Sequence, residues 1–229
     1  VLDGEWEFYP DLFVYPPDFR FSKKSFSPKY VQVPASHPIY SDNSGEYKTG
    51  YGTYRISIKL PATGLYALDY DFIYTSAKIW VNRELVYQLG TPSKTSDSAK
   101  AVFSFDCIPI NISYLDENGY AEIIINVSDY HSAQKFGLTK SITIGKYEVL
   151  MNKRDMNKTI FHMILGLLAI MSIYHLALFV FYPRNYAVLA FALLTLSIML
   201  RAIFTNTISF GPADYSISIR FTYASAVLF

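Results

Sequence analysis

The chain has little charge in its C-terminal third and almost no cysteine. Residues 155–229 contain only four basic and two acidic side chains. A soluble domain of this length needs a more charged surface, so a purely soluble protein is excluded. The hydrophobic content of 51% also excludes a disordered chain. The single cysteine, Cys107, excludes an internal disulfide framework and a multi-cysteine metal site.

Catalytic and nucleic-acid-binding signatures are also missing. The net charge is only +1 and there is no basic run, which disfavours nucleic-acid binding. The chain lacks a Gly-x-Ser-x-Gly motif, a phosphate-binding glycine loop and a His-Glu-x-x-His motif. Its four histidines are scattered, so no zinc site is expected. We therefore expect no enzyme in this chain, and no cofactor or metal.

A long apolar run indicates a membrane-crossing helix. Residues 160–182 contain no Asp, Glu, Lys or Arg. As a helix this run would span roughly 35 Å, enough to cross a hydrocarbon layer about 30 Å thick. Pro183 and Arg184 break the run, and a second crossing is expected over residues 186–208. A third helix is expected to start at 217–229, so the lipid bilayer is an expected partner.

Two polar residues stand out in the expected helices. Arg201 lies late in the second crossing and is read either as a side chain that snorkels to the interface or as a charge paired with another helix. His175 and His162 are thirteen residues apart and face different directions, so they cannot share a metal. We read both histidines as neutral packing groups. Arg201 and His175 are kept as functional candidates.

The N-terminal 150 residues are predicted to be β throughout. Residues 53–60 alternate, with Tyr54, Ile56 and Ile58 on one face and Thr53 among the residues of the other. Residues 121–127 show the same period of two, which indicates one wet and one dry face. About nine short strands with proline and glycine punctuation predict an all-β sandwich or jelly roll, followed by α-helical transmembrane segments. Cys107 is expected to be a small buried hydrophobe.

The expected organisation has three parts. Residues 1–150 form the sandwich, 151–159 a juxtamembrane joint, and 160–229 the start of a helical membrane domain. The polar stretch 148–159 is either a short rigid joint or the beginning of the first helix.

Aromatic residues supply the candidate ligand site. Trp80 shares the parity of Lys78 and Asn82, so it is expected on the less buried sheet face. It is either a packing lid or a platform for a sugar ring or a partner. The other candidates lie in or beside loops, with core packing as the alternative: Tyr130, His131, Tyr40 and Tyr51.

The order of several short motifs resembles one family. The motifs are residues 2–9 (LDGEWEFY), 33–36 (VPAS), 52–55 (GTYR), 77–82 (AKIWVN), 127–131 (VSDYH), 142–145 (ITIG), 174–175 (YH) and 184–186 (RNY). This series resembles the galactose-binding-like domain and first two crossings of bacterial seven-transmembrane receptors with diverse intracellular signalling modules. The opening is also similar to the sugar-binding domain of β-galactosidase-type glycosidases.

One turn departs from the family pattern. The family's hairpin usually carries Asn-Gly, which suits a primed turn, whereas here Asn82 precedes Arg83. An arginine at positive φ is costly, so a different turn type is expected.

The resemblance implies an extracytoplasmic sensor domain on a multi-pass protein of the bacterial inner membrane. It also implies a cytoplasmic output module, such as a cyclase, histidine kinase or phosphatase, outside this sequence. The flanking charges predict the opposite orientation, with the β domain in the cytoplasm. Lys153, Arg154 and Lys158 precede the first crossing and only Arg184 follows it. We follow the resemblance, because export of a folded domain can override a few flanking charges.

The expected function is that of a receptor fragment. The sandwich would sense an extracellular small molecule or glycan and relay its presence through the helices, and a homodimer is left open. One alternative is a membrane-anchored carbohydrate-binding or adhesion module without signalling. Another is an accessory domain of an envelope glycosidase.

Overall fold

The computed structural model divides the chain into two compact units, Val1–Met151 and Asn152–Phe229. It describes residues 1–21, 26–34, 50–70, 76–103, 106–130, 137–205 and 213–214. Each unit is considered by itself.

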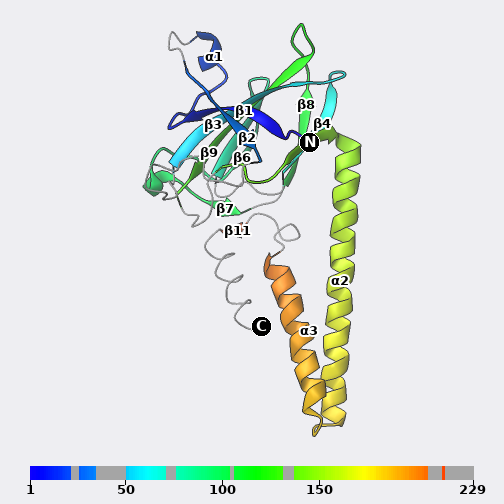
Figure 1. Ribbon diagram of the computed structural model, residues 1–229. Coiled ribbons are helices and arrows are strands. Elements are labelled where there is room, and N and C mark those ends of the chain that lie inside the picture. Colours follow the sequence, from blue (N-terminus) through cyan, green and yellow to red (C-terminus); the bar gives the residue numbers. More distant parts are fainter. Residues whose placement is uncertain are drawn as a thin grey trace. The chain divides into compact units, whose positions relative to one another are not determined.

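The first unit is an antiparallel β-sandwich (Figure 1). Its six-stranded sheet has the order β2-β1-β3-β9-β5-β6, and its three-stranded sheet the order β10-β4-β8. The strands of the first sheet are β1 (Gly4–Pro10), β2 (Lys29–Val33), β3 (Gly50–Lys59), β5 (Ser76–Val81), β6 (Glu84–Leu89) and β9 (Tyr120–Asp129). The second sheet contains β4 (Gly64–Tyr70), β8 (Asp106–Ile112) and β10 (Ile142–Lys146). The short elements are α1 (Asp18–Phe21), η1 (Ser96–Ser98), β7 (Val102–Phe103) and β11 (Ala213–Asp214). The predicted β-sandwich followed by helices is confirmed.

The core lies between the two sheets and follows the alternation of the sequence. Ile123, Ile125 and Val127 of β9 point into it, as do Tyr54 and Ile58 of β3. Side chains two residues apart share a face of a strand, so a single register buries them all. The inward faces predicted for these two strands are therefore confirmed.

The outer face of the six-stranded sheet is partly covered, which the sequence did not predict. The Thr53 hydroxyl donates to the Leu12 carbonyl at 2.8 Å and accepts from the Val14 amide at 2.9 Å. The amide of Asp11 donates to the Tyr51 carbonyl at 3.1 Å. We call residues 11–19 the strap. Thr53, expected on the solvent face, is fully buried, because the strap lies over it.

The three-stranded sheet is also covered on its outer face. Ala67 of β4, Cys107 of β8 and Leu150 form a small buried cluster, with Tyr147 and Met151 packed against it. Leu150 belongs to the first turns of α2 (Tyr147–Phe181). Cys107 is a small buried hydrophobe as predicted. Of the two interpretations of residues 148–159, the structure shows the beginning of the first helix.

The second unit contains the rest of α2 and helix α3 (Tyr186–Thr205), joined by a four-residue turn (Figure 1). Both helices are long and apolar enough to cross a membrane. Within the described residues only 6% and 11% of their most apolar windows are buried, whereas the core helix of a soluble protein is mostly buried. The Ser172 hydroxyl donates to the Ala192 carbonyl at 3.1 Å, which holds the two helices together at a small residue. The expected third helix, 217–229, and residues 206–208 of the second crossing lie outside the described residues.

Candidate functional site

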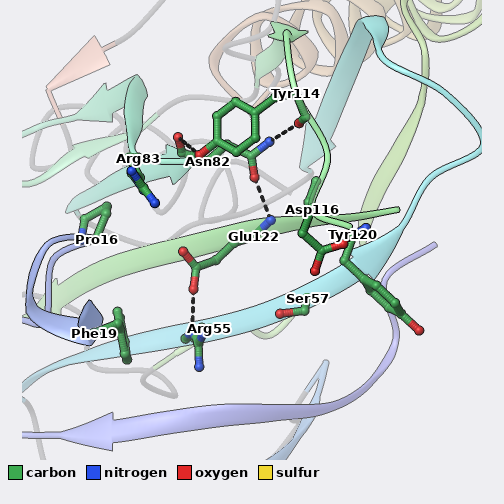
Figure 2. Close-up of a pocket in the computed structure, with 11 residues that line it drawn as sticks. Pro16, Phe19, Arg55, Ser57, Asn82, Arg83, Tyr114, Asp116, Tyr120 and Glu122 are labelled. Carbon is green, nitrogen blue, oxygen red and sulfur yellow. Dashed lines mark hydrogen bonds and ion pairs between the residues drawn. The ribbon is translucent and has the colours of Figure 1, made fainter. Parts of the chain in front are cut away.

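A pocket of about 220 Å³ opens on the outer face of the six-stranded sheet (Figure 2). The strap supplies one wall through Pro16 and Phe19. The β5–β6 turn supplies a second wall, and the β8–β9 connection a third. The volume is smaller than the roughly 300–1,000 Å³ of sites for drug-sized ligands. The pocket therefore suits a small ligand, about the size of a single sugar ring. The lining residues are Pro16, Phe19, Arg55, Ser57, Asn82, Arg83, Tyr114, Asp116, Tyr120, Ala121 and Glu122.

The floor of the pocket is a fixed chain of charges. The Arg55 Nε donates to Glu122 Oε1 at 2.6 Å, and its Nη1 donates to Glu7 Oε2 at 2.9 Å. The Phe19 ring lies 4.4 Å from the Arg55 guanidinium carbon, in a cation–π contact. Burial alone would lower the pKa of Arg55, but the two carboxylates raise it overall. The Arg55 charge is thus neutralised and held in place.

The β5–β6 turn corrects one prediction from the sequence. Asn82 and Arg83 both have positive φ, 45° and 77°. Positive φ at both central residues is what a type I′ turn requires, so the expected change of turn type is wrong. Arginine in this region is strained and persists only where the surroundings fix the backbone.

Asn82 provides that fixation through four hydrogen bonds. Its Nδ2 donates to the Tyr114 carbonyl at 2.7 Å, and its own carbonyl accepts from the Tyr114 hydroxyl at 2.8 Å. Its Oδ1 accepts from the Glu122 amide at 2.9 Å, and its amide donates to the Glu122 carbonyl at 3.0 Å. The turn is therefore locked to β9 and to the β8–β9 connection (Figure 2).

Arg83 and Asp116 lie on opposite sides of the pocket (Figure 2). Both are exposed, and Arg83 makes no ion pair or hydrogen bond within the described part of the chain. Asp116 accepts from the amides of Asn118 and Tyr120 through Oδ1 alone. A guanidinium that can donate thus faces a carboxylate that can accept, beside the half-exposed rings of Tyr114 and Tyr120. This combination can bind a ligand with several hydroxyl groups and one apolar face.

Two of the residues singled out in the sequence lie on the same outer face. Trp80 is half-buried there, on the face expected from its parity, with the Tyr15 ring edge-on at 6.0 Å. Tyr51 contacts the Phe13 ring at 4.9 Å. Alternate strap residues therefore cover both candidates, and neither lines the pocket.

Tyr130 lies at the opposite end of β9 from the pocket. Its hydroxyl donates to the Lys94 carbonyl at 2.6 Å. Burial raises its pKa, and the negative charge that Tyr51 or Asp11 carries when ionised raises it further. His131 and Tyr40 fall outside the described residues.

The membrane-half candidates occupy ordinary helical positions. The His175 Nδ1 donates to the Met171 carbonyl at 2.8 Å, and its ring lies 4.4 Å from the ring of Phe191 on α3. The His162 Nδ1 likewise bonds the Lys158 carbonyl. Arg201 is exposed in the last turns of α3. Their functional roles stay predictions.

Reasoning from the sequence missed the pocket residues themselves. From the sequence, Arg83 is only a departure in a turn, whereas in the structure it lines the pocket. Asp116 and Tyr114 stand in a connection with no motif, and only the hydrogen bonds between Asn82 and Tyr114 show that this connection lies beside the turn. Among the described residues, no cluster of His, Cys, Asp or Glu could hold a metal ion.

No protein-family model and no curated protein match the chain. Several solved glycosidase structures are similar to it. A GH2 β-galacturonidase from Eisenbergiella tayi bound to galacturonate is 11% identical, with a TM-score of 0.41, and the match covers 62% of this chain and 23% of that one. A β-glucuronidase from Faecalibacterium prausnitzii is 21% identical, with a TM-score of 0.35 and coverages of 56% and 20%. The Ruminococcus gnavus β-glucuronidase is 18% identical, with a TM-score of 0.36 and coverages of 56% and 21%. The chain thus spans about a fifth of the length of these enzymes.

Proposed function

We propose that the chain is the ligand-sensing and membrane-anchoring part of a bacterial signalling receptor. The sandwich binds a small carbohydrate in the pocket between Arg83 and Asp116, and α2 carries the response to the membrane. The output module implied by the sequence resemblance lies outside this sequence.

The chemistry of the pocket supports a sugar as ligand. Asp116 accepts hydrogen bonds from hydroxyl groups, Arg83 donates them, and Tyr114 or Tyr120 offers a face for the apolar side of the ring. The guanidinium of Arg55 is already neutralised by two carboxylates, so the pocket has no excess of positive charge. A neutral polyol fits this balance better than a strongly anionic ligand.

The observation that carries the sensing role is the connection between sandwich and helix. Strand β10 ends at Lys146 and α2 starts at Tyr147, with no linker residue between them. Leu150 in the first turn of α2 is also buried against Ala67 and Cys107 of the sandwich. A binding module that was only tethered would need no such direct connection, whereas a sensor needs its ligand to favour one of two states of the chain, and a helix that begins within the sandwich unit can report that state.

The proposal includes an orientation of the chain in the membrane. The sandwich faces the extracytoplasmic side of the bacterial inner membrane, and the turn after α2 faces the cytoplasm. Protease accessibility in intact spheroplasts tests this arrangement. Protection of the sandwich would overturn it.

Binding is tested on the full 229-residue chain in lipid nanodiscs. Isothermal titration with glucose, galactose and N-acetylglucosamine should show binding of at least one. Asp116→Asn keeps the Oδ1 acceptor of the turn but removes the charge, and should weaken that binding about tenfold. The matched control is Asp97→Asn, an exposed residue of η1 outside the pocket, which should change nothing. No binding of any sugar would overturn the carbohydrate role.

The relay is tested with an insertion. A Gly-Ser pair between Lys146 and Tyr147 should leave sugar affinity unchanged. In the protein without the insertion, added sugar should change the rate of amide hydrogen exchange over residues 147–158. The insertion should abolish that change. The same pair inserted at the exposed turn between Ala62 and Thr63 is the control. If sugar binds but exchange in the uninterrupted chain does not respond, the chain is an anchored binding module without signalling.

A further inference from the structure

The outer sheet face continues beyond the pocket, beneath the strap, and contains buried polar groups without a partner among the described residues. Asn126 of β9 is 1% exposed, and neither its Oδ1 nor its Nδ2 has a hydrogen-bond partner among those residues. The Trp80 Nε1 is also buried and has no partner in the described part of the chain. Buried polar groups are nearly always hydrogen-bonded, so each exception calls for an explanation.

The two groups belong to one small surface. Trp80 pairs with Ile124 across the β5–β9 ladder, and Lys78 pairs with Asn126. Trp80 and Asn126 are therefore diagonal neighbours on the same face, within reach of each other through their side chains. On the other side of β9, Asn126 pairs with Thr53, the strap's anchor.

This surface is continuous with the pocket. Arg55 and Glu122 form the pocket floor, and Arg55 pairs with Ile124 one step along β9. The strap follows β3 in the same direction, from Asp11 beside Tyr51 to Phe19 over Arg55. The pocket thus lies at one end of a longer strip of this face, beside the C-terminal end of the strap, and the strap lies along the rest.

We propose that this strip is a second sugar subsite, which an oligosaccharide occupies when the strap is displaced. The inference rests on the proposed carbohydrate role of the pocket. The first sugar unit lies between Arg83 and Asp116. The following units lie over Trp80, where the Asn126 amide and the indole N–H bond their hydroxyl groups. The ligand is therefore an oligosaccharide and not a single sugar.

The hold of the strap on the sheet is compatible with displacement. Two hydrogen bonds of Thr53 and one of Asp11 fix its backbone. The ring contacts of Phe13, Tyr15 and Phe19 and the buried side chains of Val14 and Pro16 add to its packing. A ligand that satisfies the Asn126 amide and the indole N–H gains interactions that the closed strap does not provide.

The test compares chain length in the full protein in nanodiscs. Titrations use glucose through cellotetraose, and N-acetylglucosamine through chitotetraose. We expect affinity for one of the two series to rise at least about tenfold from the monosaccharide to the trisaccharide. Equal affinity for all lengths, with the monosaccharide bound, overturns the second subsite but leaves the pocket intact. No binding at any length overturns both proposals.

Two variants test whether the increase in affinity with oligosaccharide length comes from contacts with the strip. Asn126→Val should remove most of the chain-length gain, leave monosaccharide affinity unchanged and keep the protein folded, because an unsatisfied amide is replaced by a strand-forming side chain. Tyr15→Ala uncovers Trp80 and should strengthen oligosaccharide binding, since less of the ligand's binding energy is used to move the strap. An Asn126→Val protein with an unchanged chain-length gain, or a Tyr15→Ala protein that binds oligosaccharides more weakly, contradicts the proposal.

Discussion

Replacing Arg83 with glycine should make the sandwich more stable. Arg83 has a φ of 77° in a turn that Asn82 fixes with four hydrogen bonds. A non-glycine residue in this region costs about 1–2 kcal/mol. Glycine avoids that cost but loses about 0.4–1 kcal/mol through the greater freedom of the unfolded chain. The net gain is about 0.5–1 kcal/mol, because no hydrogen bond or ion pair of Arg83 within the described residues is lost. For a unit of this size the melting temperature should rise by about 2–3 °C.

The assay is thermal unfolding of the nanodisc-embedded chain, followed by the fluorescence of Trp6 and Trp80. The matched control is Glu84→Gly, the exposed neighbour that begins β6. It should lower the melting temperature, because there glycine adds only entropy to the unfolded chain. Arg83→Lys should change little. A fall in melting temperature for Arg83→Gly comparable to that of Glu84→Gly would refute the strain argument. Arg83→Gly should also weaken sugar binding, because it removes the guanidinium from the pocket. Its melting temperature should therefore rise while its affinity for sugar falls.

Three further changes test other parts of the structure. Thr53→Val leaves the buried Val14 amide without its acceptor. It should therefore lower the free energy of unfolding by about 1–3 kcal/mol in urea titrations and increase protease cleavage within the strap. Unchanged cleavage would count against the anchoring role of Thr53. Gly52→Ala should destabilise the sandwich by about 1–3 kcal/mol in the same titration, since the new Cβ would lie 2.7 Å from the Phe8 ring, whereas Gly166→Ala, which meets nothing within 4 Å, should be tolerated. Ser172→Ala should weaken the α2–α3 pairing by about 0.6 kcal/mol, measured by energy transfer between labels on the two helices during detergent titration; an identical titration curve would show that this hydrogen bond contributes nothing.

The strands of the core were predictable because their pattern is local. In β9, alternate residues are apolar, and one rule about side-chain direction places Ile123 and Ile125 in the core. The apolar helices were predictable for a similar reason, since length and lack of charge are read directly from the chain.

The pocket was not predictable because distant contacts create it. Asn82 holds its turn through Tyr114, which is 32 residues away in the sequence. The sequence shows the cost of an arginine at the turn but not the bonds that offset it. Thr53 shows the same limit, because alternation places it outside and only the strap, 39 residues away from it at Val14, buries it.

The buried position of Cys107 gives the protein a built-in reporter of local opening. It is the chain's only cysteine and is 4% exposed, packed with Ala67 and Leu150. A thiol reagent should reach its sulfur when the first turn of α2, which carries Leu150, separates from β4 and β8. The labelling rate, divided by the rate for an exposed thiol, gives the equilibrium constant of that separation. The wild-type protein therefore allows the free energy of this opening to be measured without any added probe site.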